Sequence, residues 1–201
     1  MIRADLHIHT KYSFDSSINP KTLVDQLYAH EYIKAIAVTD HGSVEGCRRV
    51  SELACVYPDV LAIPGVEVGT PEGDLVVLGK AELPPKPWGI REVIDFAREN
   101  GCLTVVPHPY RGYGLGSLAK KFSFDAIEVL NGCSSTQTNK LAENLARETG
   151  LPGVAGSDAH HASELWTVYT EIQASLDIDE VLRAIRKGLV KVSSTGKSIC
   201  F

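Results

Sequence analysis

The feature that most constrains this chain is the placement of its histidines. Six of the seven, all but His30, fall in four short clusters with apolar flanks, and three of these clusters also hold an aspartate. The clusters lie at residues 5–9, 39–42, 106–109 and 156–161. Each follows a short apolar run that is typical of a buried β-strand. Because the carboxyl ends of parallel strands share one mouth, residues roughly 150 positions apart can ligate the same ions.

The first cluster has the spacing of a ligand pair. Alternate side chains of a strand share a face, so we expect Asp5, His7 and His9 to project together. Leu6 and Ile8 should then face the opposite way. Two imidazoles on one face can bind one ion.

The last cluster repeats this spacing with Asp158 and His160. Imidazole nitrogen and carboxylate oxygen without thiolate suit Zn, Mn or Fe in a catalytic site better than a closed structural zinc site. The alternative is that each histidine is an ordinary polar residue at a strand end. Four such clusters in one chain favour a multinuclear metal site over that alternative.

Length and composition indicate one globular domain over residues 1–201, with 44% hydrophobic and 22% charged residues. The formal net charge of −5 gives no general attraction for nucleic acid, so we expect no stable nucleic-acid complex. A nucleic-acid substrate would have to be held locally, by metal ions and a few basic side chains. With no apolar run near about 18 residues and no signal peptide, we expect a cytoplasmic protein without a membrane partner.

The five cysteines show no Cys-x-x-Cys spacing, which indicates free thiols in a reducing compartment. Cys133 follows an apolar strand and is the one alternative candidate for a catalytic thiol. Because no histidine or other base is indicated nearby in the sequence, that role is not favoured.

Strand and helix patterns alternate through most of the chain. Strands are expected at residues 1–6, 35–38, 60–67, 74–78, 103–106, 126–130, 153–155, 168–172 and 190–192. Helices are expected at residues 22–31, 44–56, 90–100, 137–148 and 178–187. The strand at 74–78 is expected to return as a hairpin partner, and the Pro-rich segment 83–87 reads as a linker between elements. This alternation predicts a parallel, barrel-like α/β fold.

Taken together, the motifs resemble those of the PHP (polymerase and histidinol phosphatase) family, over about residues 4–172. The matching stretches, in order, are Asp5-Leu6-His7-Ile8-His9-Thr10, Thr39-Asp40-His41-Gly42, Pro64-Gly65-Val66-Glu67, His108-Pro109 and Gly156-Ser157-Asp158-Ala159-His160. The resemblance is specific because several motifs match in a fixed order. It implies a distorted (β/α)7 barrel, TIM-barrel-like, with a trinuclear metal centre at the carboxyl ends of its strands. It also implies metal-dependent hydrolysis of phosphoesters.

The resemblance further implies three sets of ligands for divalent ions, which would be Zn, Mn or Fe. The first ion would be bound by His7, His9, Glu67 and Asp158. Glu67 would bridge to a second ion, held also by His108. The third would be bound by Asp15, His41 and His160. From the residues alone, Asp15 is the weakest of these ligands, because a loop aspartate usually forms a turn or a cap; its place after the first motif favours the ligand role. An acidic residue after an apolar strand, as at Glu67, is unusual if it only faces solvent.

The chain departs from the family pattern at one place. Many small members of the family have another histidine after the bridging glutamate, in a His-hydrophobic-Leu-Gly setting. Here the stretch reads Asp74-Leu75-Val76-Val77-Leu78-Gly79, with no histidine between His41 and His108. The second ion is therefore expected to be weakly held, completed by solvent, or present only with substrate, so that two or three ions are bound.

Two further residues are candidates for the chemistry, in which a metal-bridged hydroxide attacks phosphorus in line. Asp40 is expected to accept a hydrogen bond from a ligating imidazole, or alternatively to cap the following helix. Arg111, three residues after His108, is expected to clamp a phosphate; the alternative is a solvent-exposed loop arginine.

Three functions are compatible with these residues. The first is a hydrolase of phosphomonoesters or small phosphodiesters, such as nucleotides or oligonucleotide ends. The second is a histidinol-phosphate phosphatase, and the third is a non-catalytic module that binds metal for structure or docks a larger complex. A degenerate module should have lost ligands throughout, whereas only one expected histidine is absent, which favours an enzyme.

Overall fold

The computed structural model describes residues 1–196, so Cys200 lies outside the described residues. Its strands are β1 (Ile2–Ile8), β2 (Ala35–Val38), β3 (Leu61–Thr70), β4 (Gly73–Leu78), β5 (Leu103–Val106), β6 (Ala126–Asn131), β7 (Gly153–Gly156), β8 (Val168–Ile172) and β9 (Val190–Ser194). Its helices are α1 (Pro20–Ala29), α2 (Glu45–Ala54), α3 (Ile90–Glu99), α4 (Thr136–Thr149), α5 (Ile178–Arg186) and the 3-10 helix η1 (Gly116–Lys121). All the expected strands and helices are present. None of the described helices has the length and apolar character needed to cross a membrane.

The strands form one sheet in the order β7-β6-β5-β4-β3-β2-β1-β8-β9. Within β1 to β7, neighbours are parallel except at β4, which runs antiparallel to both β3 and β5. The β3–β4 hairpin predicted from the sequence is confirmed. The reversal of β4 is what distorts the barrel, because this strand replaces a helical crossover with a tight turn.

The sheet closes through β1, which pairs differently along its length. Its first half pairs antiparallel with β8 over Ile2–Ala4. Its second half meets the segment after β7, where the Asp158 N–H donates to the His7 carbonyl at 2.7 Å and the His9 N–H donates to the Ala159 carbonyl at 3.0 Å. The result is a nearly closed barrel, which confirms the predicted fold class.

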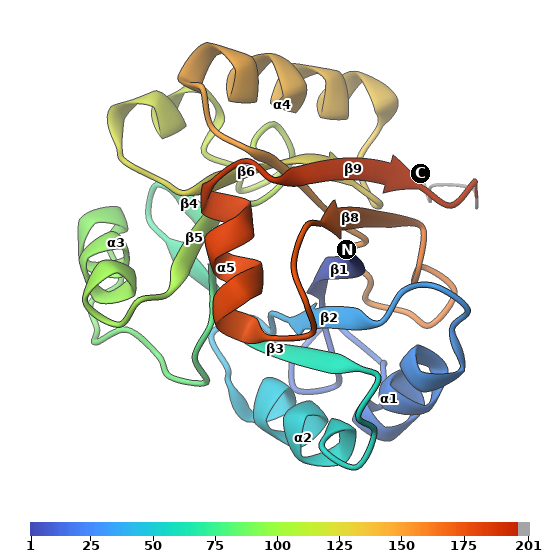
Figure 1. Cartoon of the computed structure of the whole chain (residues 1–201). Coiled ribbons are helices and arrows are strands. Elements are labelled where there is room, and N and C mark those ends of the chain that lie inside the picture. Colours follow the sequence, from blue (N-terminus) through green and yellow to red (C-terminus); the bar gives the residue numbers. More distant parts are fainter. Residues whose placement is uncertain (197–201) are drawn as a thin grey trace.

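Apolar side chains fill two layers. The inner layer contains alternate strand residues such as Ile63, Leu78 and Leu103, together with Leu182 and Ile185 of α5. The outer layer packs the opposite faces of the strands against α1 to α4 and η1. Figure 1 shows α5 lying across the barrel, with α1 to α4 around its outside. Because α5 packs on residues near the amino-terminal strand ends, it closes that end and leaves the other end open.

Candidate metal centre

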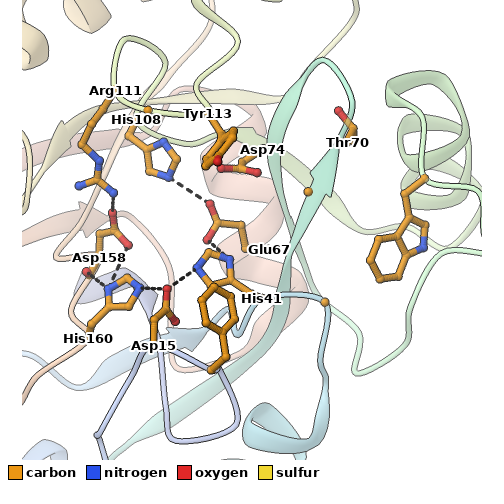
Figure 2. Close-up of a pocket in the computed structure, with 15 residues that line it drawn as sticks. Asp15, His41, Glu67, Thr70, Asp74, His108, Arg111, Tyr113, Asp158 and His160 are labelled. Carbon is orange, nitrogen blue, oxygen red and sulfur yellow. Dashed lines mark hydrogen bonds and ion pairs between the residues drawn. The ribbon is translucent and has the colours of Figure 1, made fainter.

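The predicted ligands come together at the carboxyl-terminal mouth of the barrel, and Figure 2 shows six of them, all but His7 and His9. They come from β1 and the residue after it, from β3, from the loops after β1, β2 and β5, and from the segment after β7. In chain order they are His7, His9, Asp15, His41, Glu67, His108, Asp158 and His160. Segments about 150 residues apart thus meet at one site, as the cluster pattern predicts.

Four of these side chains form a compact buried group. The Nε2 atoms of His7 and His9 lie 3.1 Å apart. Each Nε2 atom also lies close to Glu67 Oε2, at 3.3 and 3.2 Å, and to Asp158 Oδ1, at 3.4 and 3.2 Å. This is the set that the resemblance implied for a first ion.

The strict alternation predicted for β1 is wrong. The pairing of β1 with β2 shifts register between Asp5 and Ile8. Leu6 therefore packs in the inner layer and Ile8 in the outer one. Asp5 does not join the imidazoles, because its Oδ1 accepts the backbone N–H groups of Ser157, at 2.8 Å, and His7, at 3.4 Å. Because of this irregularity, the imidazoles of His7 and His9 both reach the mouth, while Ala4 and Leu6 of the same strand pack in the inner apolar layer.

A second, more open group surrounds Asp15. Its Oδ2 lies 3.4 Å from the Nε2 atoms of both His41 and His160. The His9 ring lies between the other two rings, with centroid distances of 4.4 Å to His41 and 4.2 Å to His160. The three imidazoles offer nitrogen atoms within 4.8 Å of one another, which is close enough to share an ion.

Glu67 connects these groups to His108. Its Oε1 lies 3.0 Å from His108 Nε2, while its Oε2 lies 3.2 Å from His41 Nδ1 as well as close to His7 and His9. A fully buried carboxylate with its two oxygens directed to different histidines has the arrangement of a bridging ligand. The additional histidine of the family pattern is absent, and the residue of β4 opposite Glu67 is the inner-layer Val76.

Two of the candidate ligands have unusual backbone conformations. His108 has a φ of 26° and Asp158 a φ of 56°, values that residues other than glycine seldom adopt. Such strain persists where surrounding structure fixes it, and it concentrates at functional sites. It supports a functional role for both residues.

The electrostatics of the mouth call for positive charge. Burial lowers the pKa of His7, but the carboxylates of Asp158, Glu128 and Glu67 outweigh it and hold this pKa well above its usual value. Burial likewise opposes the charge on His9, yet hydrogen bonds to Asp158 and Glu67 raise its pKa to about 9. Burial raises the pKa of Glu67, and the charge of His7 with hydrogen bonds from its neighbours brings this pKa well below the usual range. The buried carboxylates therefore stabilise either protonated imidazoles or bound cations. The nitrogen and oxygen donors of this group fit divalent metal ions.

Sequence reasoning missed Glu128, which orients two ligands from β6. Its Oε1 lies 3.0 Å from His7 Nδ1, and its Oε2 accepts the backbone N–H of His108 at 2.8 Å. Asn131 donates to Glu128 Oε2 at 2.9 Å and to Asp158 Oδ2 at 3.1 Å. The signal was an acidic residue inside an apolar strand, the same signal that identified Glu67. Carboxylates in this position fix the tautomer and orientation of a ligating imidazole.

Asp40 contacts a ligating imidazole indirectly, through the side chain of Ser13. Its carboxylate accepts hydrogen bonds from the backbone N–H and hydroxyl of Thr10, at 2.6 and 2.7 Å, and from the Ser13 hydroxyl at 3.0 Å. Ser13 Oγ in turn lies 3.2 Å from His9 Nδ1. The structure therefore replaces the predicted direct bond with a relay through Ser13. The alternative, a cap on α2, is wrong because the N-cap of α2 is Val44, without a side-chain hydrogen bond.

Arg111 lines the mouth but is already paired. Its guanidinium forms an ion pair with Asp158 Oδ2 and donates to Asn131 Oδ1 at 3.2 Å. The side chain is about one-third exposed, so the solvent-exposed loop alternative does not describe it. Its role toward a phosphate stays a prediction. Cys133, the alternative nucleophile, donates from Sγ to the Asp158 carbonyl at 3.5 Å and does not line the cavity of the described residues.

Six of the eight candidate ligands, all but His7 and His9, line a cavity of about 620 Å³. On its rim lie Phe14, Trp88 and Tyr113, together with Asp74 and Thr70. Phe14 and Tyr113 are 91% and 82% exposed, which is unusual for large aromatic side chains. The cavity therefore combines a charged floor with an aromatic rim.

Comparisons with known proteins show what this chain is similar to in sequence and fold. A family profile described as PHP-associated matches residues 136–190. The uncharacterized protein MJ1587 of Methanocaldococcus jannaschii is 31% identical over 141 residues, which cover 65% of this chain and 82% of that protein. Two solved structures have similar folds.

PsfC from Pseudomonas syringae PB-5123 has a TM-score of 0.74 at 18% identity, covering 98% of this chain and 93% of that chain. A proposed metal-dependent phosphoesterase from Bifidobacterium adolescentis ATCC 15703 has a TM-score of 0.62 at 15% identity, covering 78% of this chain and 87% of that chain. At these identities, the two likenesses show the fold alone.

Proposed function

Because the chain belongs to the PHP (polymerase and histidinol phosphatase) domain family, we propose that it is a metal-dependent hydrolase of phosphoester bonds. The observation that carries this proposal is the convergence of buried imidazoles and carboxylates around Glu67. His7, His9 and His41 approach one of its oxygens, and His108 approaches the other. Such a constellation positions more than one cation beside a cavity that is open to substrate.

The chain would divide the chemical work among its own groups. His7, His9, Glu67 and Asp158 would hold one ion, with Asp15, His41 and His160 holding another. Divalent ions bound there supply Lewis acidity toward phosphoryl oxygens and lower the pKa of nearby water. Glu128 and the Asp40–Ser13 pair keep the imidazoles of His7 and His9 oriented.

Arg111 would orient the phosphate. The guanidinium lies at the cavity wall, anchored by Asp158 and Asn131, with the side chain still partly open to solvent. A planar guanidinium matches two oxygens of a phosphate group. Anchoring reduces the conformational entropy lost when substrate binds.

The rim supports phosphoesters that carry a flat ring. Phe14, Trp88 and Tyr113 surround a floor that would bind phosphate, and aromatic faces stack on nucleobases. The net charge of −5 disfavours long nucleic acids, so small substrates are favoured. We therefore propose nucleotides or oligonucleotide ends as the substrate class.

A hydrolysis panel tests this function. Protein stripped with a chelator would be supplemented with Mn²⁺, Zn²⁺ or Fe²⁺ and assayed on p-nitrophenyl phosphate, its bis-ester, histidinol phosphate, mononucleotides and short oligonucleotides. We expect turnover only with metal, and most efficiently on nucleotides or oligonucleotide ends. Preference for histidinol phosphate would replace the substrate class, and bound metal without any turnover would favour the non-catalytic module.

Two variants control the panel. His7→Ala should abolish turnover. His161→Ala is the matched control, because this histidine is exposed and contacts Ser17 rather than the ligands. Equal activity in both variants would contradict the proposed site.

A further inference from the structure

Asp74 lies on the inward face of β4, above two inner-layer residues. Val76 and Leu78, which alternate with it along the strand, both belong to the inner apolar layer. In the β3–β4 hairpin, Val76 pairs with Glu67, and Asp74 pairs with Gly69 two residue pairs nearer the mouth. The alternation of β4 therefore directs a carboxylate into the cavity where the apolar layer ends.

The surroundings leave the carboxylate of Asp74 open to a ligand. Its backbone N–H donates to the Tyr113 carbonyl at 2.9 Å, which fixes the main chain. Within residues 1–196, no N–H or O–H group donates a hydrogen bond to its carboxylate oxygens. Gly69, on the opposite strand, has no side chain to fill the space beside this carboxylate. A Cβ atom at Gly69 would lie 3.5 Å from Asp74 Oδ1. Figure 2 shows Asp74 and Glu67 side by side at the cavity.

Asp74 completes a triangle with two groups already described. One oxygen of Asp74, one oxygen of Glu67 and one ring nitrogen of His108 all lie within 4.8 Å of one another. His108 is buried, and its Nδ1 has no hydrogen-bond partner among the described residues.

We propose that Asp74 is a further ligand of the second ion, which the family resemblance assigns to Glu67 and His108, in place of the absent histidine. The inference rests on the proposed function, which gives Glu67 its bridging role. The position has two carboxylates and one imidazole, and it retains open coordination sites. This donor set suits a harder ion such as Mn²⁺, whereas the neighbouring group of His9, His41 and His160 offers three nitrogens.

The position should be the weakest of the centre. It has three protein ligands, and Asp74 is only half-buried, so solvent competes for the ion. Substrate oxygens can occupy the open sites, because Asp74 lies on the same cavity wall as Tyr113 and Thr70. The ion would therefore exchange readily in the free protein and bind more tightly with a phosphate ester present.

Counting bound Mn²⁺ tests the inference independently of activity. Chelator-stripped protein would be titrated with Mn²⁺ while the electron paramagnetic resonance signal of free Mn²⁺ is followed. For the Asp74→Asn variant we expect at least about a tenfold increase in the Kd of the weakest site, as for removal of a charged ligand. Glu72→Gln, which removes an exposed carboxylate from the same hairpin turn, should match the wild-type protein.

Asp74→His guards against a simple folding defect. It should keep the ion count of the wild-type protein, because an imidazole replaces the carboxylate as ligand, and circular dichroism would verify the fold of each variant. An unchanged isotherm for Asp74→Asn would overturn the inference while leaving the proposed function intact. Absence of Mn²⁺ binding by the wild-type protein would overturn both.

Discussion

The two ends of the barrel are built from the same strands but have opposite chemistry. On β3, Ile63 faces the apolar interior, and Glu67, four residues later, faces the metal-binding mouth. On β5, Leu103 belongs to the interior, and His108 follows the end of the strand. At the amino-terminal end, α5 covers the interior with Leu182 and other apolar side chains.

The contrast teaches that stability and chemistry are separated along the barrel axis. The closed end gains free energy from apolar burial, which is insensitive to ions. The open end buries charged groups that stabilise one another only while enough positive charge is present. Residues of the two ends should therefore respond differently to substitution.

The largest effect is expected at the open end, for His7→Ala. Loss of an imidazole that approaches both Glu67 and Asp158 should reduce kcat by more than the 10–100-fold typical of outer-shell changes, so by at least about 10³-fold. Steady-state kinetics with saturating Mn²⁺ and thermal unfolding of the same samples would measure it. A destabilised but fully active variant would break the comparison.

The counterpart at the closed end is Leu182→Ala. Leu182 is buried in the inner layer, and its truncation should reduce the free energy of unfolding by about 2–5 kcal/mol. Metal content and kcat below the unfolding temperature should stay at wild-type values. Urea denaturation measures the first effect and elemental analysis the second. Lost metal in a folded variant would mean that the two ends are coupled.

Glu128→Gln tests the carboxylate that orients the ligands His7 and His108. The amide can still accept the His108 N–H but offers less charge to His7, so metal affinity should fall by about 10–100-fold. Glu99→Gln, at an exposed position at the end of α3, is the control. Isothermal titration with Zn²⁺ gives both affinities. Equal affinities would restrict Glu128 to a structural role.

Metal binding should depend on pH in a defined direction. The pKa of His9 is raised to about 9, so its imidazole is protonated at pH 7.5 in the metal-free protein. A metal ion needs the neutral ring, and binding must release that proton. Affinity should rise by about tenfold per pH unit and per released proton up to about pH 9, then level off.

Calorimetry in two buffers of different ionisation enthalpy would count the released protons at pH 7.5. We expect at least one, and fewer at pH 10. Binding without proton release at pH 7.5 would show that the imidazoles of the open end are already neutral.

The smallest effect is expected for Arg111→Lys. Lysine keeps the charge near Asp158 but loses the planar pair of donors, so KM should rise by about tenfold. The metal content should stay at that of the wild-type protein, which elemental analysis would verify. An unchanged kcat/KM would remove Arg111 from the phosphate site.

The sequence predicted the barrel because its strands and helices alternate with strong apolar runs. It also predicted which clusters meet, since strand ends such as those before His41 and His108 share one mouth. The β3–β4 hairpin was foreseen from the turn at residues 70–73. These features depend on local pattern, which a single sequence contains.

Features that depend on tertiary contacts were not foreseen. The register shift in β1 separates Asp5 from His7, and it arises where β1 exchanges β8 for the segment after β7. The relay from Asp40 through Ser13 depends on how the loop after β1 folds back onto the start of α2. Gly46 permits this close approach, since a Cβ atom there would lie 1.8 Å from Asp40 Oδ2.

Anomalous diffraction from crystals soaked in Mn²⁺ tests the central claim most directly, because it locates the ions without reference to activity. The account predicts two or three anomalous peaks at the carboxyl-terminal mouth. One should lie among His7, His9, Glu67 and Asp158, and one near Asp15, His41 and His160. A mouth without anomalous density at saturating Mn²⁺ would contradict the assignment of this end of the barrel as a metal centre.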